Sequence, residues 1–120
     1  TNGTVAFAGT GTSAVMGDTA FGGLECVTPG KAVAFEAGKT FTVGGMLRLR
    51  NAAVRSTGEG VSASLTLDPV TGLQDIRAVS VRDSDASGGQ TLFALPHSTD
   101  LGNNVNWAFI PSPGTLLLLR

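Results

Sequence analysis

The stretch Gly60-Val-Ser-Ala-Ser-Leu-Thr-Leu-Asp68 alternates apolar and polar residues, and this alternation decides the fold class. A period of two is typical of a β-strand with one face against a core and the other in water. The sequence therefore predicts a strand whose inward face carries Val61, Ala63, Leu65 and Leu67. Its outward face carries Ser62, Ser64, Thr66 and Asp68.

The same alternation recurs along the chain. It places Val5 with Phe7, and Val33 with Phe35, on inward faces. Within residues 40–51, a glycine pair at 44–45 separates two alternating stretches, which predicts a bulge or sharp bend. Further strands are expected at residues 21–27, 77–82, 91–95, 105–110 and 115–119, about nine in total. One helical turn near residues 73–79 is the weaker alternative, because β-branched residues follow.

Turn-forming residues separate these strands at short intervals, as at Pro29-Gly30, Asp68-Pro69 and Pro113-Gly114. Short strands with frequent turns favour an all-β, single-domain antiparallel β-sandwich of the jelly-roll or immunoglobulin type. We expect residues 1–110 to form this sandwich. Residues 111–120 would add a Pro-Gly turn and either a hydrophobic strand or the remnant of a sorting signal.

Composition narrows the function classes. The net charge of −1 is too small for nucleic-acid binding, which needs clustered Lys and Arg. The 42% hydrophobic content argues against disorder. Cys26 is the only cysteine, so an intrachain disulfide is excluded, and we expect a buried, inert thiol. No cluster of His, Cys or carboxylate residues suggests catalysis, so the protein is not expected to be an enzyme.

In a strand, the four consecutive leucines at 116–119 would place apolar side chains on both faces, so neither face would suit water. A strand at residues 115–119 therefore needs burial on both faces, in its own sandwich or in a neighbouring subunit. The run is too short to cross a membrane, so membrane contact is expected only through an anchor beyond Arg120. We expect a homo-oligomer or filament in which Val5, Phe7, Leu116, Leu117, Leu118 and Leu119 contribute to assembly.

Two polar groups are candidate binding sites. Asp83, Asp85 and Ser87 carry side-chain oxygens at alternate positions before a glycine pair, as the ligands of calcium loops do. The favoured alternative is a polar turn in which the Asp side chains cap backbone amides. No other cofactor is expected. Arg48, Arg50 and Arg55 form a candidate patch for an anionic sugar or polysaccharide matrix, with a purely solubilising role as the alternative. His97 is interpreted as a loop residue and Trp107 as a core residue.

Two segments resemble a known family. Ile110-Pro-Ser-Pro-Gly-Thr-Leu-Leu-Leu-Leu119 resembles the start of the sorting signal of PEP-CTERM proteins. Gly38-Lys-Thr-Phe-Thr-Val-Gly-Gly-Met-Leu47, with the alternating stretch at 60–68, is similar to the exported β-sandwich domains called choice-of-anchor proteins. The resemblance implies export and residence at the surface or in the matrix of a Gram-negative bacterium, with no catalytic residues.

These observations favour a secreted, non-enzymatic structural protein, located outside the cell or on its surface. A filament or surface-layer subunit that assembles by strand addition is the leading hypothesis. The alternatives are a carbohydrate- or matrix-binding module and a viral capsid-decorating or tail protein.

Overall fold

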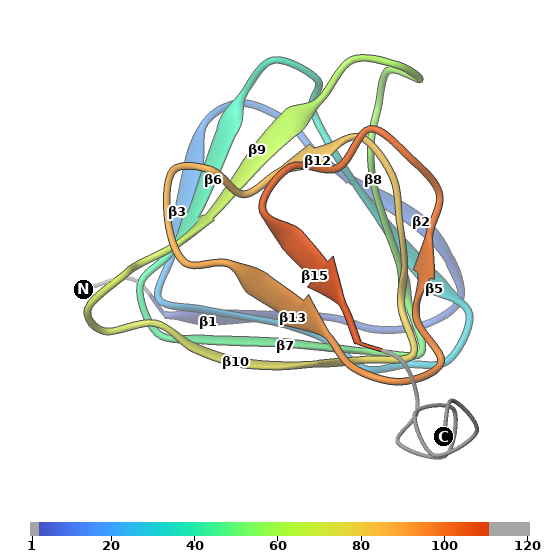
Figure 1. The fold of residues 1–120 in the computed structure, drawn as a ribbon, viewed down its shortest axis with the longest axis horizontal. Helices are drawn as coiled ribbons and strands as arrows, with labels where there is room; N and C mark the ends of the chain where they lie inside the picture. Colours follow the sequence, from blue (N-terminus) through green and yellow to red (C-terminus); the bar gives the residue numbers. More distant parts are fainter. Residues whose placement is uncertain (1–2, 111–120) are drawn as a thin grey trace, which may run out of the picture.

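The computed structural model describes residues 3–110, and this part of the chain contains fifteen β-strands and no helix. The strands pair in parallel, and the chain winds into a β-solenoid of about five turns (Figure 1). The all-β class is confirmed. The predicted antiparallel β-sandwich with about nine strands is wrong, because each strand pairs with the strand one turn later and not with its neighbour in sequence.

Three sheets form the walls of the solenoid and appear as three sides of a triangle in Figure 1. Sheet A contains β1 (Thr4–Phe7), β4 (Gly23–Cys26), β7 (Met46–Arg50) and β10 (Leu73–Arg77). Sheet B contains β2 (Gly11–Val15), β5 (Lys31–Phe35), β8 (Ala53–Ser56), β11 (Ser80–Val81) and β14 (Thr99–Asp100). Sheet C contains β3 (Thr19–Phe21), β6 (Thr40–Val43), β9 (Ala63–Leu67) and β12 (Ser84–Asp85). A further parallel pair joins β13 (Leu92–Ala94) to β15 (Trp107–Phe109).

The turns differ in length. Leu24 pairs with Leu47, and Leu47 pairs with Gln74, so the second of these two turns is longer than the first. The final pairing, of Leu92 with Trp107, closes a turn much shorter than either. A solenoid is usually recognised in sequence by a fixed repeat length. The variable turn length here explains why no repeat is evident in the sequence.

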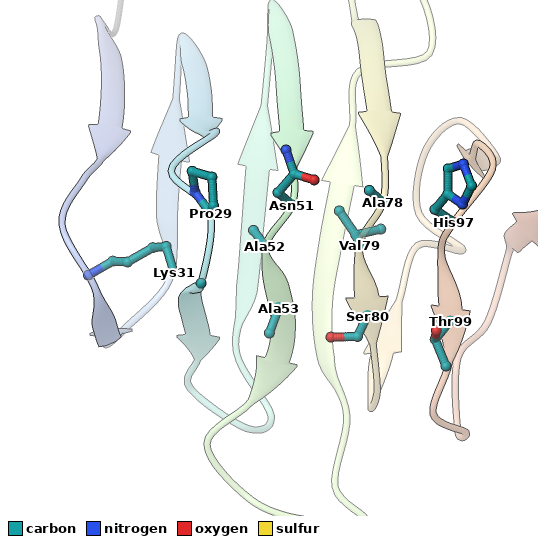
Figure 2. A pocket seen from close by; sticks show the side chains of 11 residues that line it. Pro29, Lys31, Asn51, Ala52, Ala53, Ala78, Val79, Ser80, His97 and Thr99 are labelled. Carbon is teal, nitrogen blue, oxygen red and sulfur yellow. The ribbon is translucent and has the colours of Figure 1, made fainter.

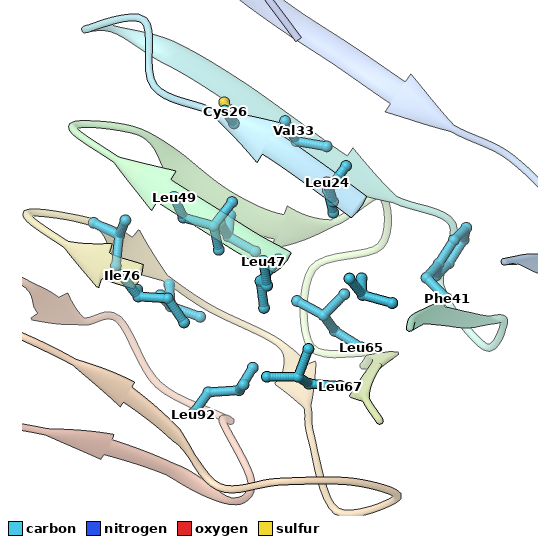
Figure 3. Close-up of a cluster of buried hydrophobic side chains, with 14 of the residues drawn as sticks. Leu24, Cys26, Val33, Phe41, Leu47, Leu49, Leu65, Leu67, Ile76 and Leu92 are labelled. Atoms are coloured by element: carbon cyan, nitrogen blue, oxygen red, sulfur yellow. The ribbon is translucent and has the colours of Figure 1, made fainter. Parts of the chain in front are cut away.

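Columns of apolar side chains fill the interior (Figure 3). Each column stacks a residue on its partner in the next turn, so that apolar contact and backbone pairing follow the same register. Three such columns are Cys26–Leu49–Ile76, Val33–Val54–Val81 and Phe41–Leu65. Every residue of these columns is buried. The core is therefore a continuous rod of side chains enclosed by the three sheets.

Residues in the left-handed region turn the chain at two of the three corners. Between sheets A and B (the A–B corner) these are Gly9, Gly30, Asn51, Ala78 and His97. Between sheets B and C (the B–C corner) they are Gly17, Gly38, Gly60, Asp83 and Asn103. Glycine, asparagine and aspartate enter this region at least cost. Gly30, which the sequence suggested as part of a turn between antiparallel strands, thus lies at a corner of the solenoid.

Close approach of neighbouring turns requires glycine at the third corner, between sheets C and A. A Cβ atom at Gly45 would lie 2.6 Å from the carbonyl oxygen of Gly22. At Gly89 it would lie 2.1 Å from the carbonyl oxygen of Leu67. Both distances are shorter than any tolerated contact, so these corners pack backbone directly on backbone. The predicted bend at the glycine pair 44–45 is confirmed as one of these corners.

The inward positions of the best alternating stretches are confirmed, since Leu47, Leu49, Leu65 and Leu67 are all buried. Val61 was assigned to the core wrongly. Its side chain is 54% exposed, because the loop at the B–C corner continues to residue 62 and β9 starts only at Ala63. Residues 73–77 form strand β10 and not a helical turn. The predicted strand at 115–119 lies outside the described residues.

Leu65→Ala should lower the free energy of unfolding by about 2 to 5 kcal/mol, because it leaves a cavity against Phe41 in the middle of the rod. Ser64→Ala, on the outward face of the same strand, should cost less than about 0.5 kcal/mol. Urea unfolding followed by circular dichroism measures both changes. Equal losses at the two positions would show that the register of β9 is wrong.

Candidate functional site

A shallow pocket of about 420 Å³ lies along the A–B corner (Figure 2). It spans four successive turns, which supply Gly30, Asn51, Ala78 and His97 at the corner itself. Backbone amides stack these turns: Gly30 N–H donates to the Asn51 carbonyl, and Asn51 N–H to the Arg77 carbonyl. The wall of this A–B corner pocket is therefore rigid backbone.

Four polar side chains line the A–B corner pocket, namely Asn51, Ser80, His97 and Thr99. They come from three neighbouring turns (Figure 2), and the side-chain hydrogen bonds found around them within residues 3–110 use other side chains. Ser80 pairs with both Ala53 and Thr99 across the sheet, so these three residues form a row on the outer face of sheet B. The pocket thus offers polar groups with unused hydrogen-bonding capacity.

Of the acidic residues, lysines and arginines that the structure describes, Lys31 alone lines the A–B corner pocket. Its side chain points away from the other lining residues and toward the first turn (Figure 2). The lysine is 5% exposed, so its aliphatic stem is packed within the chain. Within residues 3–110, no acidic, lysine or arginine side chain therefore lies beside the polar lining residues.

The B–C corner holds the aspartate predicted as a calcium ligand. Asp83 is buried, and its Oδ2 accepts hydrogen bonds from the Gly60 amide and from Arg82. Its Oδ1 accepts a bond of 2.8 Å from the Asn103 amide group. The Asn103 hydrogen bond, followed by those from Gly60 and Arg82, holds the pKa of Asp83 below its usual value against the opposing effect of burial. The carboxylate therefore joins three turns at this corner.

Asp85 and Ser87, the other two candidate calcium ligands, are joined by a hydrogen bond. Asp85 lies on β12, and its Oδ1 accepts a bond of 2.9 Å from the amide of Ser87. Both aspartates thus cap backbone amides, which is the geometry that the turn interpretation predicts. Within residues 3–110 no group of three His, Cys, Asp or Glu side chains is arranged to hold a metal ion.

The predicted arginine patch is divided between two sheets. Arg48 and Arg50 lie on the outer face of sheet A, where both contact Asp75, and Arg48 also lies 3.6 Å from Glu25. The hydrogen bond from Arg50, assisted by the charges of Arg77 and Arg48, lowers the pKa of Asp75 although burial opposes this. This ladder of opposite charges joins three successive turns of sheet A.

Arg55 lies on sheet B, apart from that ladder. It donates a hydrogen bond of 2.9 Å to the hydroxyl oxygen of Thr12. Because Arg55 pairs with Ala34 and Thr12 with Ala32, the guanidinium crosses β5 above these two alanines. Both alanines are buried although they face outward. Arg55 therefore links β8 to β2 across β5.

The two ends of the solenoid differ. The first turn forms the edge of all three sheets, and its inward residue Val5 is 40% exposed while Phe7 is partly buried. At the other end, β13 and β15 lie inside the triangle outlined by earlier turns (Figure 1). Trp107 and Phe109 stack there with ring centroids 6.1 Å apart and pack on the core. The shortened last turn thus covers the interior, whereas the first turn leaves it open.

The remaining single residues have clear structural positions. Cys26 is completely buried, as predicted, and burial raises the pKa of its thiol, with Lys31 acting in the opposite direction. Trp107 packs against the core as predicted and donates a hydrogen bond of 3.1 Å to the hydroxyl of Ser84. His97 is exposed in a loop, as interpreted, but that loop is a wall of the A–B corner pocket.

Sequence reasoning missed Asn51, Ser80 and Thr99 as pocket residues. They are far apart in the chain and meet only because successive turns stack. The one available signal was Asn51, a residue type that favours the left-handed conformation required at a corner.

Comparison of the chain with models of protein families, with curated proteins and with solved structures found no match. No helix of the described residues is long and apolar enough to span a membrane.

Acid should destabilise the protein through Asp83. A carboxylate with a lowered pKa in the folded state contributes stability above its unfolded pKa of about 3.9, and this contribution disappears as the pH falls through the folded pKa. Asp83→Asn should therefore give a shallower loss of unfolding free energy between about pH 5 and pH 2. Urea unfolding at several pH values measures the slope.

Glu59→Gln is the matched control, because Glu59 is exposed at the same corner and makes no hydrogen bond through its side chain to described residues. It should leave the slope unchanged. A slope equally steep in the Asp83→Asn variant would contradict the role assigned to this carboxylate.

Proposed function

We propose that this protein is a non-enzymatic structural subunit that assembles end to end outside the cell. The observation that carries the proposal is the open first turn. Strands β1, β2 and β3 each have a sheet neighbour on one side only within the described chain, so all three present unpaired backbone groups at the same end. Such an edge is a template for another strand.

Apolar side chains at this end add a reason for association. Val5 is exposed, and Phe7 and Val15 are only partly buried against the core. An incoming strand paired with β1 would cover Val5 and Phe7, and each apolar side chain moved fully out of water contributes about 1.5 to 3 kcal/mol. Solenoids generally need a covered terminal turn to remain soluble. At the opposite end Trp107 and Phe109 pack over the core, although β14 and β15 also have a sheet neighbour on one side only within the described chain.

The proposed incoming strand is residues 115–119 of a second copy. Its leucines at 116–119 need burial on both faces, and this segment lies outside the described residues. Because the donor segment and the acceptor edge are different surfaces, the contact is heterologous. Repetition of a heterologous contact gives a filament or a ring and not a closed dimer.

Location outside the cell follows from the resemblance of residues 110–119 to an export signal and remains part of the proposal. Binding to a polysaccharide matrix through Arg48, Arg50 and the Asp83–Asp85 region is the weaker alternative, because the side chains of Arg48, Arg50 and Asp83 already pair within the chain. A viral capsid-decorating or tail protein would use the same end-to-end contact.

Val5→Lys should abolish assembly, because it places a charge on the acceptor edge where an incoming strand would bury it. Removal of residues 115–120 should have the same effect by removing the donor. Light scattering coupled to size-exclusion chromatography, over a range of protein concentrations, measures the mass of the unmodified chain and of both variants. Circular dichroism verifies that each variant remains folded.

Val70→Lys is the matched control, since it makes the same substitution at a residue that is 88% exposed and lies two turns beyond the first turn. This variant should assemble like the unmodified chain. The proposal fails if the unmodified chain remains monomeric at all concentrations, or if the Val5→Lys variant assembles unchanged.

A further inference from the structure

We propose that the A–B corner pocket binds a linear, neutral oligosaccharide. This inference goes beyond assembly, because none of the described residues that line the pocket lies on the first turn. Stacked turns form the pocket, so the inference does not depend on residues 115–119.

The shape of the A–B corner pocket fits an elongated ligand. Its walls come from successive parallel turns, which repeat about every 4.8 Å along the solenoid axis. Ala53, Ser80 and Thr99 therefore lie at successive heights along one line, and Asn51 lies at the corner two residues before Ala53. A chain of similar units that lies along this line would meet the hydroxyls of Ser80 and Thr99 on adjacent turns, with the Asn51 amide beside it at the corner. The volume of about 420 Å³ is within the range of ligand pockets, about 300 to 1,000 Å³.

The chemistry of the lining matches sugar hydroxyls. The hydroxyls of Ser80 and Thr99 and the amide of Asn51 each donate and accept hydrogen bonds, as sugar hydroxyls also do. Between them, the accessible apolar floor consists of Ala53 with Pro29 at one side, because Ala52 and Val79, which also line the pocket, are buried in the core. Such a floor accepts the apolar C–H face of a pyranose ring while the polar groups bind its edge.

The charge distribution favours a neutral ligand over an anionic one. Among residues 3–110, no carboxylate lines the A–B corner pocket, and the one lysine that does, Lys31, extends away from the polar residues (Figure 2). A polyanion would require several cations directed into the pocket. Two arginines follow pocket residues along the chain, but Arg55 donates to Thr12 and Arg82 to Asp83, and neither lines the pocket.

Titration with four soluble neutral probes, cellohexaose, chitohexaose, maltohexaose and mannohexaose, tests the proposal on the full chain. Isothermal calorimetry measures affinity, and amide chemical shifts locate the contact. We expect at least one probe to bind one-to-one and to shift the amides of Asn51, Ser80 and Thr99. Ala53→Arg should fill the pocket and weaken binding at least about tenfold.

Ala20→Arg is the matched control, because Ala20 faces outward on sheet C and is remote from the A–B corner. It should leave the affinity unchanged. The double variant Ser80→Ala with Thr99→Ala provides a second test with little risk to folding and should also weaken binding. Absence of binding by all four probes, tighter binding of oligogalacturonate, or equal effects of Ala53→Arg and Ala20→Arg would overturn the proposal.

Discussion

The whole structure depends on parallel, in-register hydrogen bonding between each strand and its equivalent one turn later. No turn has a core of its own, because the inward side chains of one turn cover only a triangular slice of the interior. Val33 is buried by Val54, and Val54 by Val81, so each turn is stabilised by its neighbours. In such an arrangement stability is approximately a sum of turn and interface contributions, and the terminal turns are the weak points. This rule applies to the first turn, which has a neighbour on one side only, and to the last turn, where Trp107 and Phe109 pack over the core.

The same register arranges polar residues across the outer surface. Glu25, Arg48 and Asp75 are far apart in sequence but lie side by side on sheet A, where they alternate in charge. Asp83 and Asn103 stack at the B–C corner, and Asn51, Ser80 and Thr99 line the A–B corner pocket. Partly exposed ion pairs contribute at most about 1 kcal/mol each, so the sheet A ladder specifies register more than it adds stability. Removal of the buried Asp83 carboxylate should cost more stability, because it would leave the donors that bind it, including a backbone amide, without a partner.

The sequence allowed the local structure to be predicted far better than its pairing. A period of two identifies Leu47, Leu49, Leu65 and Leu67 as inward residues whether the partner strand is parallel or antiparallel, and all four are buried. The same glycines and asparagines that form hairpin turns also form solenoid corners, so Gly30 and Asn51 could not distinguish the two folds. A fixed repeat would have done so, but the unequal lengths of successive turns conceal it. The A–B corner pocket was unpredictable for the same reason, since its residues meet only once the register is known.

Nuclear Overhauser contacts between strands test the central claim most directly. A parallel solenoid predicts methyl contacts between Leu24 and Leu47, Leu49 and Ile76, and Val54 and Val81, pairs whose members lie one full turn apart in the chain. It also predicts that consecutive strands such as β6 and β7, which belong to different sheets, show no Hα–Hα contacts with each other. Strong Hα–Hα contacts between consecutive strands, with the long-range methyl contacts absent, would show antiparallel hairpins and contradict the account.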